Sequence, residues 1–260
     1  MPEHGWRPYV LLSSVPQLQP PTFLTLTLVQ IGGSIAGLMQ GIMLKRLGHN
    51  VQILEQSTSS ERLEGGTGIT LGPDALEFFR RYDLMRQSSY ISNPGIQFLD
   101  SLSKVTRFIK RPMEMSTWNR LYSNLRANFD GYKSSIFPNP PDLFDSDGDA
   151  VFSIGKKATD VKYTDRRVTV QYEDLLDGGR HYLQADLVIV SDGASSQIRP
   201  LLIPNVQRQY AGYLAWRGYV DESEVSEETR KILDPNFTSY VCKGGYILRH
   251  VLYLTLRLFI

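Results

Sequence analysis

The sequence predicts an α/β fold whose first half is built around a parallel β-sheet. Residues 25–31 are rich in β-branched and apolar side chains, as expected of a buried parallel strand. A glycine-rich turn follows at residues 32–37, and apolar residues then recur at helical spacing to about residue 47. A second apolar run at residues 51–54 ends on an acid. This order of strand, turn, helix and strand is the pattern of a Rossmann-like nucleotide-binding unit.

The glycine-rich turn reads G-x-S-x-x-G and has the residue types that a dinucleotide requires. Gly32 permits the tight turn out of the strand, and Gly37 allows the helix to pack closely on it. Ser34 stands where a second glycine usually lets the backbone approach the phosphates. Glu55 follows near the spacing of about 20 residues at which a carboxylate binds ribose hydroxyls. The residues predicted to bind the dinucleotide here are Gly32, Gly33, Ser34, Ile35, Ala36, Gly37, Glu55 and Gln56.

Two other interpretations of this segment agree less well with the sequence. Residues 24–44 are uncharged and long enough to span a membrane. Gln30, Gln40 and the glycines argue against a membrane span, as does the strand that follows directly. A serine nucleophile at Ser34 is disfavoured because Ala36 interrupts the G-x-S-x-G pattern. We therefore expect neither a membrane span nor a serine nucleophile.

The composition excludes several classes of function. The chain has 260 residues and a net charge of +1, which gives no reason to expect nucleic-acid binding. The single cysteine rules out an internal disulfide and fits a reducing compartment, so a cytoplasmic location is expected. The 4 histidines lack the spacing of metal ligands, and no metal is predicted. Residues 1–22 contain several prolines without periodicity and are expected to form a disordered tail.

The remaining pattern adds helices, a hairpin and a β-meander. Helical spacing predicts helices at residues 73–82 and 116–129. Two short apolar runs on either side of a polar turn predict a hairpin, formed by residues 96–99 and 105–109. A β-meander is predicted from three runs that precede a last apolar strand at residues 185–190, namely 151–160, 168–173 and 180–183.

A second motif follows that last strand and reads D-G-x-x-S-x-x-R. Asp192 and Gly193 form a turn at the strand end, where α/β sheets bind ligands. The turn glycine frees backbone N–H groups, and Arg199 offers positive charge to a phosphate. An Asp-Gly turn is common by itself, so its value comes from its combination with the glycine-rich turn. We predict that Asp192 and Gly193 bind the same cofactor.

These motifs together resemble those of the FAD-dependent aromatic hydroxylases, the para-hydroxybenzoate hydroxylase-like flavoprotein monooxygenases. The segments GGSIAGLMQGIMLKRLGHNV, STWNRLYSNLRANFDG and YAGYLAWRGYV are similar to the 2,6-dihydroxypyridine hydroxylase-like branch. The resemblance covers about residues 24–225 and implies FAD as resident cofactor, with NADPH or NADH as electron donor. It also implies O2-dependent hydroxylation of a small aromatic or heteroaromatic substrate. Because the cofactor carries such chemistry, no catalytic side chain is assigned, and a homodimer stays open.

Four further residues are candidates for contacts with the cofactor or the substrate. Arg62 lies in a polar loop that either reaches back to the cofactor or is an ordinary flexible loop. Arg126 lies on a predicted helix and either points at a phosphate or the flavin, or is solvated. Tyr213 and Arg217 would share one face of a strand and are predicted to meet the substrate. The alternative for this pair is an ordinary sheet core with a surface arginine.

The resemblance also predicts how the chain divides into domains. Residues 23–202 would form the FAD-binding domain, interrupted by a substrate-domain hairpin near residues 94–111, and residues 203–260 would start the substrate-binding domain. Two features depart from the family pattern: Trp118 replaces an arginine of the motif R-x-x-L-x-x-x-L, and the later Gly-Asp motif is missing. We therefore expect a truncated chain with an incomplete substrate-domain sheet.

Three hypotheses for the function follow. The leading one is an FAD-dependent monooxygenase. The second is a catalytically impaired fragment that binds a dinucleotide weakly or not at all, because the Gly-Asp motif is missing. The third is a plain NAD(P)-dependent reductase, which the predicted β-meander fits poorly because such enzymes more often continue with alternating strands and helices.

Overall fold

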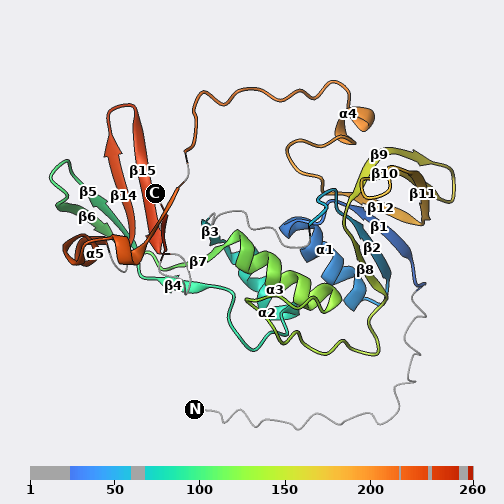
Figure 1. The fold of residues 1–260 in the computed structure, drawn as a ribbon, viewed down its shortest axis with the longest axis horizontal. Helices are drawn as coiled ribbons and strands as arrows, with labels where there is room; N and C mark the ends of the chain where they lie inside the picture. The colour runs from blue at the N-terminus through green and yellow to red at the C-terminus, as the bar shows by residue number, and fades with distance from the viewer. Residues whose placement is uncertain (1–23, 60–67, 217, 234–235, 252–256, 260) are drawn as a thin grey trace, which may run out of the picture.

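The computed structural model describes residues 24–59, 68–216, 218–233, 236–251 and 257–259. The predicted N-terminal tail, Arg62 and Arg217 lie outside these residues. Figure 1 shows a layered α/β part on one side, a second β-sheet on the other, and a long extended segment that connects them. The predicted α/β fold class is confirmed by this arrangement.

A four-stranded parallel sheet lies at the centre of the α/β part. Its strands follow the order β12-β1-β2-β8. Their bounds are β1 Thr27–Ile31, β2 Asn50–Leu54, β8 Ala150–Ser153 and β12 Leu187–Val190. All three neighbouring pairs are parallel, so the carboxyl ends of the four strands meet at one edge.

Three helices cover one face of this sheet (Figure 1). They are α1 Ile35–Arg46, α2 Pro73–Tyr82 and α3 Trp118–Asp130. Leu38 and Ile42 of α1 are fully buried against Phe129 and Ile53, which come from α3 and β2. α3 begins two residues later than predicted, because the Thr117 side chain accepts the Arg120 N–H and caps it there.

A β-meander covers the opposite face of the parallel sheet. It consists of three antiparallel strands, β9 Lys156–Tyr163, β10 Val168–Asp174 and β11 Arg180–Ala185. Val170 and Ala185 pack against Val29 in this second core. The single strand predicted at residues 151–160 is wrong, because Gly155 turns the chain at a φ of +67° from β8 into β9.

The second sheet combines residues that lie far apart in the sequence. Its strand order is β13-β16-β15-β14-β5-β6. The predicted hairpin is confirmed as β5 Ile96–Leu99 and β6 Val105–Ile109, and β5 pairs with β14 Phe237–Cys242 in parallel. The other members and their neighbouring helices are β13 Tyr219–Asp221, β15 Gly245–Val251, β16 Arg257–Phe259, η1 Glu222–Glu224 and α5 Glu227–Leu233. The predicted domain boundaries stay a prediction.

Three short strands that the sequence did not predict form a small sheet of their own. They are β3 Gly68–Leu71, β7 Met113–Thr117 and β4 Ile91–Asn93, with β7 in the middle.

No helix among the described residues has the length and apolar character needed to cross a membrane.

The segment that follows α4 Arg199–Leu202 differs from its prediction. Residues 210–216 are not in a strand, so the predicted position of Tyr213 on a strand face is wrong. A strand needs a neighbour to receive its backbone hydrogen bonds, and none of the described strands pairs with this run. The side chains of residues 201–216 are exposed.

Candidate functional site

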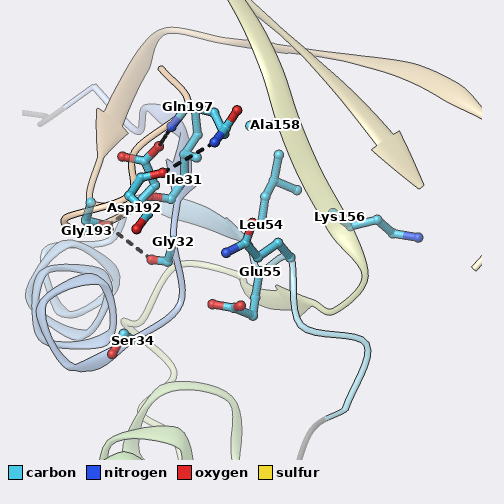
Figure 2. Close-up of a pocket in the computed structure, with 13 residues that line it drawn as sticks. Ile31, Gly32, Ser34, Leu54, Glu55, Lys156, Ala158, Asp192, Gly193 and Gln197 are labelled. Carbon is cyan, nitrogen blue, oxygen red and sulfur yellow. Dashed lines mark hydrogen bonds between the residues drawn. The ribbon is translucent and has the colours of Figure 1, made fainter. Parts of the chain in front are cut away.

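A cavity lies at the carboxyl ends of β1, β2 and β12, where an open α/β sheet binds its ligand (Figure 2). Its volume is about 140 Å³. Residues of the strand ends, the glycine turn, β9 and the Asp-Gly loop line it, namely Ile31, Gly32, Ser34, Leu54, Glu55, Gln56, Lys156, Ala158, Ser191, Asp192, Gly193, Ser195 and Gln197. The cavity therefore brings together the two motifs that the sequence singled out.

The glycine turn is built so closely that side chains are excluded at two positions. Gly32 has a φ of +101°, and a Cβ atom there would lie 2.5 Å from the Ser191 carbonyl oxygen. A Cβ atom on Gly37 would lie 2.1 Å from the carbonyl oxygen of Gly32. The first contact sets the turn against β12, and the second sets α1 against the end of β1.

The N-terminus of α1 is free to receive an anion. Ser34 is the N-cap residue, but its side chain makes no capping hydrogen bond, and the first turn contains no acidic residue. The first intrahelical bond runs from the Leu38 N–H to the Ser34 carbonyl at 2.9 Å. The N–H groups before Leu38 therefore have no intrahelical acceptor, and they carry the positive end of the helix dipole. Such a terminus suits a phosphate.

Glu55 is held rigidly at the end of β2. Its side chain is buried, and its two carboxylate oxygens accept backbone hydrogen bonds from Gly33 at 2.9 Å and from Ser57 at 2.8 Å. Each carboxylate oxygen has two lone pairs and can accept more than one hydrogen bond. The carboxylate thus already fixes the glycine turn, and its predicted contact with ribose stays a prediction.

The Asp-Gly motif forms a loop that is held by its own side chains. Asp192 accepts the backbone N–H of Gln197 at 3.0 Å, and Ser196 accepts that of Arg199 at 2.9 Å. The Arg199 guanidinium donates to the Gly193 carbonyl oxygen at 2.6 Å and more weakly to the next carbonyl. These bonds give Arg199 a role within the loop, and its predicted contact with a phosphate stays a prediction.

Arg126 is neither solvated nor among the residues that line the cavity. Its side chain is buried, donates to Asp130 at 2.8 Å and to the Tyr122 hydroxyl at 3.0 Å, and lies over the Phe152 ring at 3.7 Å. The same ring lies 2.5 Å from where a Gly33 Cβ atom would be. Arg126 therefore supports the aromatic side chain that borders the glycine turn. Its predicted contact with the cofactor stays a prediction.

Several lining residues were not predicted from the sequence. Lys156 and Ala158 belong to β9, which was not recognised as a separate strand. Ser195 and Gln197 belong to the Asp-Gly loop, where only the motif residues gave a signal. Ser191 directly precedes the Asp-Gly motif and belongs to neither sequence motif. Its hydrogen bonds could not be seen in a local pattern.

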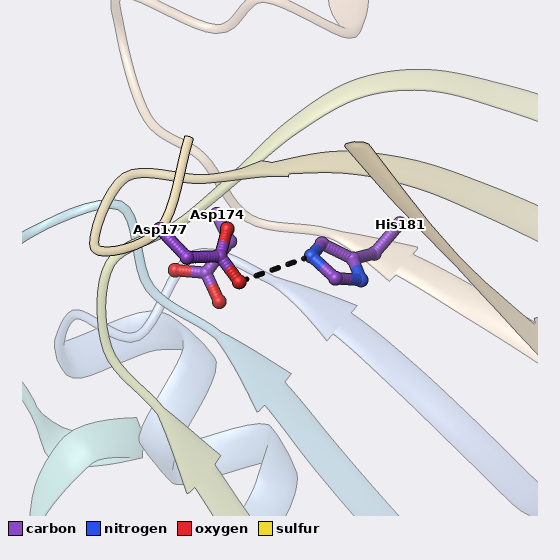
Figure 3. A group of neighbouring side chains, drawn as sticks. All are labelled: Asp174, Asp177 and His181. Carbon is purple, nitrogen blue, oxygen red and sulfur yellow. Dashed lines mark ion pairs between the residues drawn. The ribbon is translucent and has the colours of Figure 1, made fainter. Parts of the chain in front are cut away.

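One group of acidic and histidine side chains lies close together outside the cavity (Figure 3). Asp174, Asp177 and His181 form it, and no other such group occurs in the described part of the chain. Lys156 already forms an ion pair with Asp174, and its hydrogen bond keeps the pKa of that carboxyl below the ordinary value. We therefore assign these three side chains a structural role in the β-meander.

Comparisons with known proteins identify monooxygenases as relatives. A family described as FAD binding domain-like matches residues 210–253. A 2,6-dihydroxypyridine 3-monooxygenase of Paenarthrobacter nicotinovorans is 22% identical over 222 residues, which cover 85% of this chain and 49% of that protein. A 6-hydroxynicotinate 3-monooxygenase of Bordetella bronchiseptica is 26% identical over 192 residues, which cover 72% of this chain and 46% of that protein.

Solved structures give the same result for the fold. The 2,6-dihydroxypyridine-3-hydroxylase from Arthrobacter nicotinovorans has a TM-score of 0.72 at 20% identity, covering 91% of this chain and 55% of that one. Klebsiella pneumoniae HpxO in complex with FAD has a TM-score of 0.66 at 21% identity, covering 90% and 56%. The predicted resemblance is confirmed: the relatives are monooxygenases of heteroaromatic compounds, and they include an FAD-dependent urate hydroxylase of Klebsiella pneumoniae. The chain spans about half the length of the curated relatives that it matches.

Proposed function

We propose that this chain binds FAD and is an FAD-dependent monooxygenase of a small aromatic or heteroaromatic compound. One observation carries the proposal. The N-terminus of α1, the Glu55 carboxylate and the Asp192 loop converge on one cavity at the carboxyl ends of parallel strands. The homology to FAD-dependent monooxygenases supports this reading of the cavity.

The groups around the cavity fit the parts of an adenine dinucleotide. The pyrophosphate would lie at the N-terminus of α1, whose first N–H groups precede the first intrahelical bond. The Glu55 carboxylate, which its bonds from Gly33 and Ser57 hold at the end of β2, would accept the ribose hydroxyls. Gly193 has a φ of +79°, and no atom lies within 4 Å of where its Cβ would be. The loop therefore leaves open space on that side for the cofactor.

When bound, FAD supplies the redox chemistry that an aromatic hydroxylation requires. The residues described above bind and orient it. The electron donor, NADPH or NADH, and the oxidant O2 are part of the proposal. Heteroaromatic rings are the proposed substrate class, because the relatives are named for a dihydroxypyridine and a hydroxynicotinate.

The second sheet and the segment before it are proposed to form the start of a substrate-binding domain, from residue 203. The hairpin β5–β6 joins this sheet through β14 although it comes much earlier in the chain, which supports the predicted interruption near residues 94–111. Tyr213 lies on the connecting segment and is 69% exposed, so its ring is accessible to a ligand. We extend this substrate role to Arg217 as a proposal from the sequence.

A flavin titration of the purified chain tests the proposal. We expect a yellow protein, or a colourless one that quenches the fluorescence of added FAD with saturable binding. NADPH or NADH oxidation coupled to O2 uptake, measured with a panel of hydroxypyridines and hydroxybenzoates, then tests the hydroxylase activity. A chain that takes up no FAD at all contradicts the proposal. A reduced product without O2 uptake would favour a reductase.

A further inference from the structure

We infer that Ser191 and Gln30 are positioning residues for the pyrophosphate part of the cofactor, an inference that rests on the proposed function. Gln30 lies in β1, and Ser191 directly follows β12. Their side chains meet beside the glycine turn, at the point where the cavity begins. Neither residue has a role in the sequence motif of the turn.

A relay of side-chain hydrogen bonds connects this pair to the turn. The amide nitrogen Nε2 of Gln30 donates to Ser191 Oγ at 3.2 Å and to Gln40 Oε1 at 3.3 Å. The single hydroxyl hydrogen of Ser191 faces two carbonyl oxygens, that of Ile31 at 3.0 Å and that of Gly32 at 3.1 Å. The Ile31 oxygen already accepts the Ser191 backbone N–H at 2.8 Å, so we assign the hydroxyl bond to Gly32. The relay therefore joins β1, α1 and the end of β12 to the first residue of the turn.

Gln30 is an unusual residue for its place. Its side chain is fully buried, and the strand residues on either side of it, Val29 and Ile31, belong to the apolar core. Its Oε1 atom has no hydrogen-bond partner among the described residues. An apolar side chain would fill the same space without burying an unsatisfied oxygen. The bonds that the amide donates are therefore the feature that distinguishes it from a leucine or methionine.

The bond from Ser191 acts on the orientation of one peptide group. The Gly32 carbonyl and the Gly33 N–H belong to the same planar unit and point in opposite directions. Ser191 holds the carbonyl side, and the Glu55 carboxylate accepts the Gly33 N–H at 2.9 Å. Holding both sides fixes the rotation of this peptide group. That rotation decides how the chain enters α1 and hence where its first N–H groups point.

A serine-to-alanine pair in the same sheet tests the inference. Ser191→Ala removes the relay, whereas Ser153→Ala removes a matched glutamine–serine bond, from Gln52 Nε2 to Ser153 Oγ at 3.1 Å, that does not touch the turn. We expect Ser191→Ala to weaken ADP and FAD binding about fivefold to tenfold, the value of one lost hydrogen bond. The same variant should bind adenosine, which lacks phosphate, with an affinity that is less than about twofold weaker than that of the parent chain. Ser153→Ala should leave all three affinities within that same limit.

A double variant separates positioning from stability. Gln30→Met combined with Ser191→Ala replaces both polar partners with apolar groups, so most of the lost thermal stability should return. If the relay positions the turn, ADP binding stays weak in the double variant. If binding returns together with the melting temperature, the relay is only structural and the inference is overturned.

Hydrogen exchange provides a readout without any ligand. The peptide that covers residues 32–38 should exchange faster in Ser191→Ala than in the parent chain and the Ser153→Ala variant. Equal exchange in all three would overturn the inference. If Ser191→Ala shows this faster exchange but the parent chain binds neither FAD nor ADP, the proposed function fails and the positioning of the turn by Ser191 still stands.

Discussion

Ser191 and Glu55 hold opposite sides of one peptide group, the one that joins Gly32 to Gly33. The Ser191 hydroxyl donates to the Gly32 carbonyl at 3.1 Å, and the Glu55 carboxylate accepts the Gly33 N–H at 2.9 Å. The two side chains come from the ends of β12 and β2, which lie on either side of β1 in the sheet. The conformation of the glycine turn therefore depends on both neighbouring strands as well as on its own glycines.

The first prediction concerns the charge of Glu55. Glu55→Gln replaces one carboxylate oxygen with an NH2 group, which would face the N–H of either Gly33 or Ser57 instead of accepting it. We expect FAD to bind about tenfold more weakly, because one backbone bond and one ribose acceptor are lost. Fluorescence titration with FAD measures this. Glu173→Gln, at an exposed position of β10, is the control. Equal affinities of the Glu55→Gln variant and the parent would contradict the role.

The second prediction concerns Gly37. Glycine-to-alanine changes inside a helix normally stabilise it, by about 1 kcal/mol. Here the new Cβ atom would lie 2.1 Å from the Gly32 carbonyl oxygen, which is backbone and has little room to move. We expect Gly37→Ala to lower the free energy of unfolding by about 1–3 kcal/mol and to weaken FAD binding. Urea unfolding measures the first effect. Gly72→Ala, where no atom lies within 4 Å of the new Cβ, should change stability little.

Elements with a strong local signal were predictable from the sequence. Pro73 at the start of α2 and the spacing of its apolar residues gave that helix its observed bounds. The hairpin β5–β6 was predicted because its turn and both strands lie within one short segment. The strands β3, β4 and β7 were missed because each is short and is defined mainly by its partner. The break between β8 and β9 was missed because β8 pairs with β2, which lies far upstream.

The candidate site likewise contains residues that the sequence predicted and residues that it could not predict. Gly32, Glu55 and Asp192 stand in motifs with a fixed local spacing, and all three line the cavity. The relay could not be predicted, because Gln30 and Ser191 are 161 positions apart in the sequence. Only the three-dimensional pairing of β1 with β12 brings them together.

The third prediction concerns the Arg199 guanidinium. It donates to the Gly193 carbonyl at 2.6 Å, so its loss should loosen the Asp-Gly loop that borders the cavity. We expect Arg199→Met to weaken FAD binding and to speed hydrogen exchange of residues 193–198. If the guanidinium acts only through its bonds to the loop carbonyls, the salt dependence of FAD binding should stay the same. A flatter salt dependence would show a direct ionic contact that salt screens. Arg166→Met, at an exposed turn, is the control.

The fourth prediction concerns a buried lysine that ties three segments together. Lys45, at the end of α1, is fully buried and donates to the Phe129 carbonyl at the end of α3 at 2.6 Å. Asp147, in the connector before β8, lies 3.7 Å from its ammonium group and also pairs with Arg46. Burial, and next the charge of Arg46, lower the pKa of Lys45 from 10.5 to about 8, although Asp147 opposes the shift.

This lowered pKa gives a defined pH dependence. Between pH 8 and 10.5 the unfolded chain still binds a proton on Lys45 that the folded chain has released. The free energy of unfolding should therefore rise with pH across this window, by up to about 3 kcal/mol in total for this group. Urea unfolding at several pH values measures it as the difference between the parent and Lys45→Met. Lys162→Met removes a lysine whose side chain is 78% exposed and should leave the slope unchanged. A parent and a Lys45→Met variant with parallel pH profiles would show that Lys45 titrates normally in the folded chain.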